Sequence, residues 1–150
     1  DFDLAVYVKG DRKAVFLYDA YLEIDYDGGV VPPEDEADLE LRQLAAPNSV
    51  SSRGERTKQV NVQSCNLGPD TTDGTVTLEG VSIVAGIDPV SFTDTFTGLA
   101  SGLCVDSAFT WTAPDQGTTI IWTATVDGDL DDPDLDNNTA TDSTLVYPKR

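Results

Sequence analysis

Apolar and polar residues alternate along most of this chain, the pattern typical of β-strands with one buried face. The clearest example lies near the C-terminus, where Ile120, Trp122, Ala124 and Val126 occupy every second position. No long window combines helical periodicity with an absence of Gly, Pro and Thr, which are frequent here and disfavour helices. We therefore predict an all-β protein.

Seven strands are predicted in the C-terminal part, separated by turns rich in Pro, Gly, Asn and Asp. The third changes phase at Gly80, between Val76–Leu78 and Val81–Ile83, so we expect a bulge or bend there. Seven strands in about 110 residues predict an immunoglobulin-like β-sandwich, whose core should include Trp111 and Trp122. The strands are expected at about 38–44, 57–66, 75–84, 90–96, 109–111, 120–126 and 138–147.

Two further strands are predicted in residues 1–26, joined by a turn at Gly10–Asp11. The following segment, 27–37, contains Gly-Gly, Pro-Pro and several acids, which is typical of a linker. The sequence thus predicts an N-terminal β-ribbon (1–26), a linker (27–37) and a β-sandwich (38–150). The apolar positions of the ribbon are Leu4, Val6, Val8, Ala14, Phe16, Tyr18, Ala20, Leu22, Ile24 and Tyr26.

An isolated two-stranded ribbon is only marginally stable in water, so this one needs a partner sheet. It is either the end of a preceding β-rich domain, or a ribbon that pairs with a neighbouring molecule, or an addition to the sheets of its own sandwich. Strand exchange between copies would use its apolar face. The residues assigned to that assembly are Leu4, Val6, Val8, Phe16, Tyr18, Leu22 and Ile24.

Charge is distributed unevenly along the 150 residues, whose net charge is −18. Residues 59–148 contain fourteen acids and no Lys or Arg, whereas seven of the nine bases lie in the first 58 positions. Most carboxylates of the stretch 59–148 must therefore face water, bind cations or meet bases from elsewhere. Such a polarity would favour head-to-tail contact between copies.

Composition also excludes several functions. There is no His, so neither a Ser-His-Asp triad nor an imidazole metal site can form. Nucleic acids and anionic membranes would be repelled, and no apolar run is long enough for membrane insertion. Asp94, in phase with Phe92 and Phe96, is the one inward-facing acid, and it has no evident partner. We do not expect an enzyme.

Cys65 and Cys104 both lie in predicted strands. A disulfide between them would fit an oxidising compartment and would stabilise the fold by roughly 4 kcal/mol through loop closure. The alternative is two separate buried thiols. A disulfide would place the protein outside the cytosol, either secreted or at the cell surface.

An acidic turn precedes the last predicted strand. Crowded carboxylates on one loop favour a hard cation, so a Ca²⁺ site is one interpretation and a solvated turn is the other. The spacing does not fit a helix-loop-helix calcium motif, because position six is Asp132 and position twelve is Asn138. Asn137 also begins a glycosylation sequon, but the favoured interpretation is that it shapes the turn. The candidate ligands are Asp127, Asp129, Asp131, Asp134 and Asp136.

The sandwich resembles the CARDB and DUF11 families of bacterial and archaeal cell-surface repeats. The resemblance rests on Asp38-Leu39, on the strand from Val60 to Asn66 with Gly68, and on Asp136-Asn137-Asn138-Thr139-Ala140. It implies an extracellular structural module for adhesion, spacing or filament assembly, with other copies or neighbouring surface domains as partners. The alternative is a module that binds calcium or a glycan, and Ca²⁺ is the only cofactor expected.

Overall fold

Eight strands form in the computed structural model, which describes residues 35–148. The N-terminal ribbon and its assembly residues lie outside the described part. No helix of that part is long and apolar enough to cross a membrane. The elements are β1 (Leu39–Ala45), β2 (Ser49–Ser51), β3 (Thr57–Asn66), β4 (Thr72–Ser82), β5 (Val90–Leu99), β6 (Cys104–Thr112), β7 (Thr118–Gly128), the short 3₁₀ turn η1 (Leu135–Asn137) and β8 (Thr139–Tyr147).

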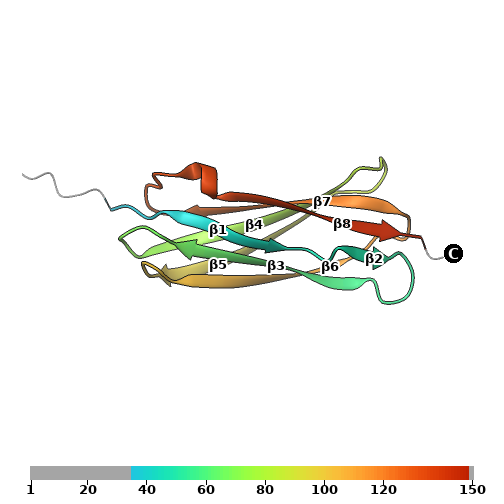
Figure 1. Cartoon of the computed structure of the whole chain (residues 1–150), viewed down its shortest axis with the longest axis horizontal. Helices are drawn as coiled ribbons and strands as arrows, with labels where there is room; N and C mark the ends of the chain where they lie inside the picture. The colour runs from blue at the N-terminus through green and yellow to red at the C-terminus, as the bar shows by residue number, and fades with distance from the viewer. Residues whose placement is uncertain (1–34, 149–150) are drawn as a thin grey trace, which may run out of the picture. The chain divides into compact units, whose positions relative to one another are not determined.

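The strands form two sheets that pack face to face (Figure 1). One sheet has the order β1-β3-β6, and the other has the order β2-β8-β7-β4-β5. All neighbouring strands are antiparallel except β2 and β8, which are parallel. The predicted all-β sandwich is thus confirmed, with one strand more than expected. The added strand, β2, has three residues, too few for an alternating pattern to be visible in the sequence.

The core lies between the two sheets and is centred on Trp122, whose side chain is fully buried. Its ring meets Trp111 of the other sheet edge to face, with 5.1 Å between the ring centres. Its indole N–H donates a hydrogen bond to Thr144 Oγ1 at 2.9 Å. Both tryptophans are therefore core residues, as the sequence predicts, and neither is available to stack on a sugar.

The bend expected at Gly80 is absent. β4 pairs with β7 in unbroken register from Gly74 to Ser82, with Gly80 directly opposite Trp122. A Cβ atom at Gly80 would overlap the Trp122 ring. The glycine therefore continues the buried face of Val76 and Leu78 while leaving room for the indole. Val81 and Ile83, in turn, are exposed on the outer face.

The close approach of Gly80 to Trp122 predicts a specific effect of substitution. Gly80→Ala should lower the free energy of unfolding by about 1–3 kcal/mol, because the added methyl group overpacks the core. Urea denaturation measures this loss. In a Trp122→Leu background the same substitution should cost much less, since the clashing ring is gone. An equal cost in both backgrounds would show that the indole is not the cause.

Candidate functional site

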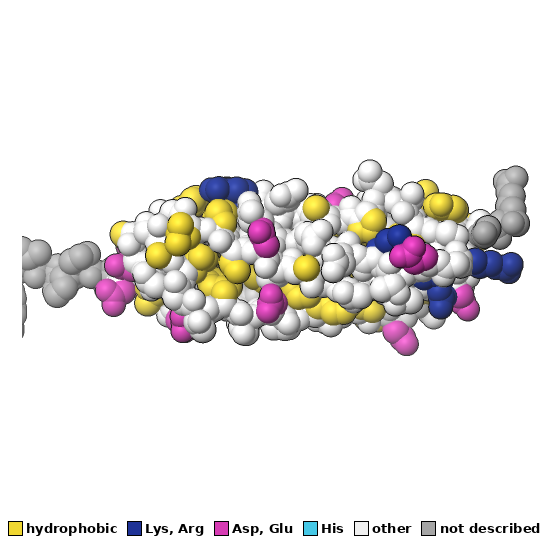
Figure 2. Space-filling model, turned by 90° about the horizontal axis from the view of Figure 1, so that it is seen from below, with side chains coloured by type: hydrophobic (Ala, Val, Ile, Leu, Met, Phe, Trp, Pro, Cys, Tyr) yellow, Lys and Arg dark blue, Asp and Glu magenta, His cyan; other side chains and the backbone are white. Residues whose placement is uncertain are grey.

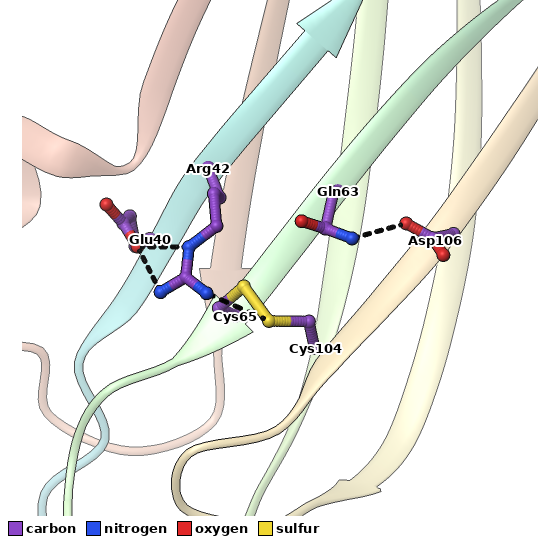
Figure 3. The surroundings of a disulfide bond; sticks show 6 residues. All are labelled: Glu40, Arg42, Gln63, Cys65, Cys104 and Asp106. Carbon is purple, nitrogen blue, oxygen red and sulfur yellow. Dashed lines mark hydrogen bonds and ion pairs between the residues drawn. A yellow bond between two sulfur atoms is a disulfide. The ribbon is translucent and has the colours of Figure 1, made fainter.

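The two cysteines form a disulfide that joins neighbouring strands of the same sheet (Figure 3). Cys65 of β3 and Cys104 of β6 are direct partners in the register, with 4.0 Å between their Cα atoms. Cys65 is buried, whereas Cys104 is exposed. The alternative of two separate thiols is therefore wrong. The bond ties β6 to β3, unlike the bond between sheets in antibody domains.

Charged and polar side chains surround the disulfide on the outer face of this sheet (Figure 3). Arg42 donates to Glu40 Oε2 at 3.1 and 3.2 Å and to Cys104 Sγ at 3.5 Å. Gln63 donates to Asp106 Oδ1 at 3.0 Å. The pair of Arg42 and Glu40 is the one salt bridge among residues 35–148. These contacts cross-link strands and bring no nucleophile together with a base.

A shallow hollow of about 210 Å³ lies beside these contacts. It is smaller than the roughly 300–1,000 Å³ of typical small-molecule pockets. Its walls are mostly polar residues of the three neighbouring strands β1, β3 and β6, so it is a depression in the sheet surface. The residues that line it are Gln43, Ala45, Asn61, Val62, Gln63 and Asp106.

The acidic turn does not gather its carboxylates around a centre. Among the described residues, no group of three or more acidic or cysteine side chains lies close enough to hold a metal ion. Asp127 is exposed on β7 opposite Thr75, and Asp136 is exposed in η1. Asp129 and Asp131 are also exposed, and their hydrogen bonds are made by the backbone. The Asp129 N–H donates to the Asp73 carbonyl, and the Asp131 carbonyl accepts from the Ala37 N–H. Asp134 is likewise exposed, and its N–H donates to Asp132 Oδ1.

Asp132, which the sequence does not single out from its neighbours, organises this turn. Its Oδ2 accepts hydrogen bonds from the Leu39 N–H at 2.9 Å and from Asn138 Nδ2 at 3.0 Å. Asn137 Nδ2 donates to Asp38 Oδ1 at 2.8 Å. The turn is therefore fastened to the start of β1, and Asn137 shapes it. The Oδ1 atoms of Asn137 and Asn138 are buried without a hydrogen-bond partner among the described residues.

Two other aspartates join the sheets at their sides. Asp94 of β5 accepts a hydrogen bond from Ser107 Oγ of β6 at 2.8 Å, which supplies the partner that the sequence could not identify. On the opposite side, Asp142 of β8 accepts one from the N–H of Ala46, just after β1, at 2.9 Å. Each bond crosses from one sheet to the other. Both aspartates therefore hold the sandwich closed.

A buried amide performs the same task at one end of the sandwich. The Asn66 side chain is fully buried, and its Nδ2 donates to the carbonyl groups of Asp70 and Leu99 at 2.7 and 2.9 Å. Its Oδ1 accepts a hydrogen bond from the Gly68 N–H. The amide thereby fastens the turn after β3 to the end of β5. It belongs to the strand that the CARDB resemblance singles out.

Neither a family model nor a curated protein sequence matches this chain. Among solved structures, a CARDB domain from Pyrococcus furiosus, determined in complex with di-metal ions, is similar with a TM-score of 0.59 and 22% identity. That match covers 75% of this chain and 96% of the other. A β-glucosidase from Listeria innocua in complex with glucose matches with a TM-score of 0.52 and 13% identity, over 74% of this chain and 16% of the enzyme's chain. The described domain is thus an immunoglobulin-like sandwich with the CARDB fold.

The geometry of the disulfide predicts the effect of reducing it. Reduction should lower the free energy of unfolding by about 2–4 kcal/mol, because the bond closes a long loop and fixes the position of β6. Urea denaturation with and without dithiothreitol measures the loss. The Cys65→Ala, Cys104→Ala double variant should resemble the reduced protein and show no response to reductant. Equal stability of the oxidised and reduced protein would contradict this.

Proposed function

We propose that this chain is a non-catalytic extracellular module whose work is structural, namely adhesion, spacing or assembly at a cell surface. The observation that carries the proposal is the use made of converging polar groups in residues 35–148. Asp94, Asp132, Asp142 and Asn66 each bind backbone groups or a side chain of another strand. The hydrogen-bonding groups of these side chains therefore stabilise the sandwich. The disulfide and the CARDB fold support an oxidising, extracellular location.

Assembly through the N-terminal ribbon is the specific form that we propose. The ribbon's alternating apolar residues need a sheet to pair with. Three bases lie in its turn region, Lys9, Arg12 and Lys13, whereas residues 59–148 have none. The ribbon as a whole has six acids besides these three bases, so attraction is confined to its basic turn region. Contact between that turn of one copy and the acidic sandwich of the next would join different surfaces, and such contact propagates along a filament.

Deletion of residues 1–29 tests this assembly. The full chain should form oligomers in size-exclusion chromatography with light scattering, and the deleted chain should be a monomer. In the full chain, Phe16→Glu with Leu22→Glu should also give monomers, because charge is placed on the apolar face. The matched control is Leu17→Glu with Tyr21→Glu, which adds the same charge at out-of-phase positions and should still assemble. Unchanged oligomers after the deletion would refute the proposed assembly.

A second candidate function, cation binding, is favoured by the two unpartnered amide oxygens of Asn137 and Asn138. Amide and carboxylate oxygens are the ligands that Ca²⁺ prefers, and Asp38 and Asp132 lie within hydrogen-bond distance of the same two side chains. These oxygen atoms are therefore ligands of the type that a hard cation binds. The Pyrococcus furiosus CARDB domain was itself determined with di-metal ions.

A thermal melt with Ca²⁺ tests this second candidate. If the site binds with a dissociation constant of about 10⁻⁴ M, about 10 mM Ca²⁺ would add roughly 2.7 kcal/mol of stability and raise Tm by roughly 10 °C. The shift should disappear in the Asn137→Ala, Asn138→Ala double variant, which removes the two amide oxygens, and should persist in the matched Asp129→Asn, Asp131→Asn double variant. Neither aspartate side chain makes a hydrogen bond among the described residues, so the fold of this control should be unaffected. An absent shift would leave the turn as a solvated connection.

A further inference from the structure

Four strands lie at the edges of the two sheets, namely β1, β6, β2 and β5. An edge strand presents backbone N–H and C=O groups that an additional strand can bind. Proteins usually block such edges with bulges, short strands, or acidic side chains placed against the free groups. The four edges of this domain differ in how far they are blocked.

β1 is blocked at both ends and interrupted between them. The Leu39 N–H donates to Asp132, and the Ala46 N–H just beyond the strand donates to Asp142, both at 2.9 Å. The pairing with β3 also shifts register between Leu41 and Gln43. A strand added at this edge would have to displace two carboxylates and follow a bulge.

β5 and β2 are blocked in other ways. At β5, the Thr95 N–H donates to Asp94 Oδ1 at 3.0 Å. Asp94 is also a charged residue directed towards the other sheet, where it binds Ser107. Such an inward charge disfavours edge-to-edge pairing. β2 has only three residues, too few to hold a long partner.

β6 has none of these features. Its nine residues pair with β3 in unbroken register, and it contains no proline. The Asn66 N–H donates to the Leu103 carbonyl, so these two residues form a hydrogen-bonded pair. Such pairs alternate along an antiparallel ladder with pairs that lack backbone hydrogen bonds, so the next pair, Cys65 and Cys104, lacks them. By alternation, the N–H groups of Asp106, Ala108 and Thr110 point away from β3. No side chain of residues 35–148 accepts a hydrogen bond from them.

A mostly apolar seam, interrupted by Asp94 between Phe92 and Phe96, runs beside this open edge. Val90, Phe92 and Phe96 of β5 and Val105 of β6 are half-buried against the core. Phe92 also lies 5.9 Å from the ring of Phe109 on β6. Figure 2 shows the domain from the side on which β5 and β6 lie in Figure 1, and hydrophobic side chains are visible across this face. The inward side chains of a strand paired to β6 would cover the seam, so that strand needs an apolar face.

We propose that β6 is the acceptor edge and that its occupant is the alternating segment 14–26 of a second copy. This inference rests on the proposed assembly function and adds the surface that receives the ribbon. The segment has thirteen residues, enough to pair with all nine of β6. Arg12 and Lys13 precede the segment and would meet an acidic stretch, whereas the segment itself carries Asp19, Glu23 and Asp25. Its pairing with β6 therefore rests on its length, its backbone hydrogen bonds and its apolar face.

A proline at Ala108 tests the acceptor edge. Its N–H faces the free edge, so Ala108→Pro should leave the β3–β6 pairing intact and weaken self-association by about tenfold or more. Thr110→Pro should act in the same way. Thr93→Pro is the matched control on β5, because the Thr93 N–H, like that of Thr95 two residues on, points to the free edge. The control should assemble normally by light scattering.

Hydrogen exchange supplies a readout that needs no substitution on β6. The amides of Asp106, Ala108 and Thr110 should exchange about tenfold or more slowly in the assembled full chain than in the chain lacking residues 1–29. Equal exchange in the two chains would overturn the assignment of β6. Slow exchange at dilutions where the chain is a monomer would instead show that its own ribbon occupies the edge, which overturns the second-copy occupant.

The outcomes separate this inference from the proposed function. If the deletion abolishes assembly while Ala108→Pro and Thr110→Pro assemble normally, β6 is not the acceptor and the assembly function stands. If the deletion leaves the oligomers unchanged, the assembly function fails as well.

Discussion

The carboxylates of this domain greatly outnumber its basic side chains, and the structure depends on what they bind instead. One salt bridge, between Arg42 and Glu40, forms among residues 35–148. The acids therefore accept hydrogen bonds from backbone N–H groups, hydroxyls and amides. Such bonds to an ionised acceptor are stronger than those between neutral groups, so a base is not required for a carboxylate to hold two strands together.

These hydrogen bonds are concentrated at the borders of the sheets, where backbone N–H groups lack strand partners. Asp132 and Asp142 bind at β1, and Asp94 binds at β5. The same contacts that close the sandwich thus protect its edges from pairing with other chains. β6 is held to its neighbour by the disulfide instead, so its outer edge can stay open without loss of attachment.

The sequence predicts the sandwich well because burial on one face imposes a strict alternation, as in β7. It misleads at Gly80, where an apparent change of phase reflects the space required by Trp122 on the adjacent strand. Contacts between distant residues carry no local signal. The pairing of Asp94 with Ser107 and the role of Asp132 depend on how the strands are ordered, which periodicity does not specify. The sequence locates the acidic turn correctly, but the spacing of its acids does not distinguish Asp132, which fastens the turn, from the exposed aspartates beside it.

Charge segregation and edge protection together restrict how copies of this chain can meet. Two sandwiches with fourteen acids and no base between residues 59 and 148 repel each other, so contact between equivalent acidic surfaces is disfavoured. A contact that brings basic side chains of one copy to the acidic stretch of another meets less repulsion. Contact between two different surfaces is therefore favoured over contact between two equivalent acidic ones.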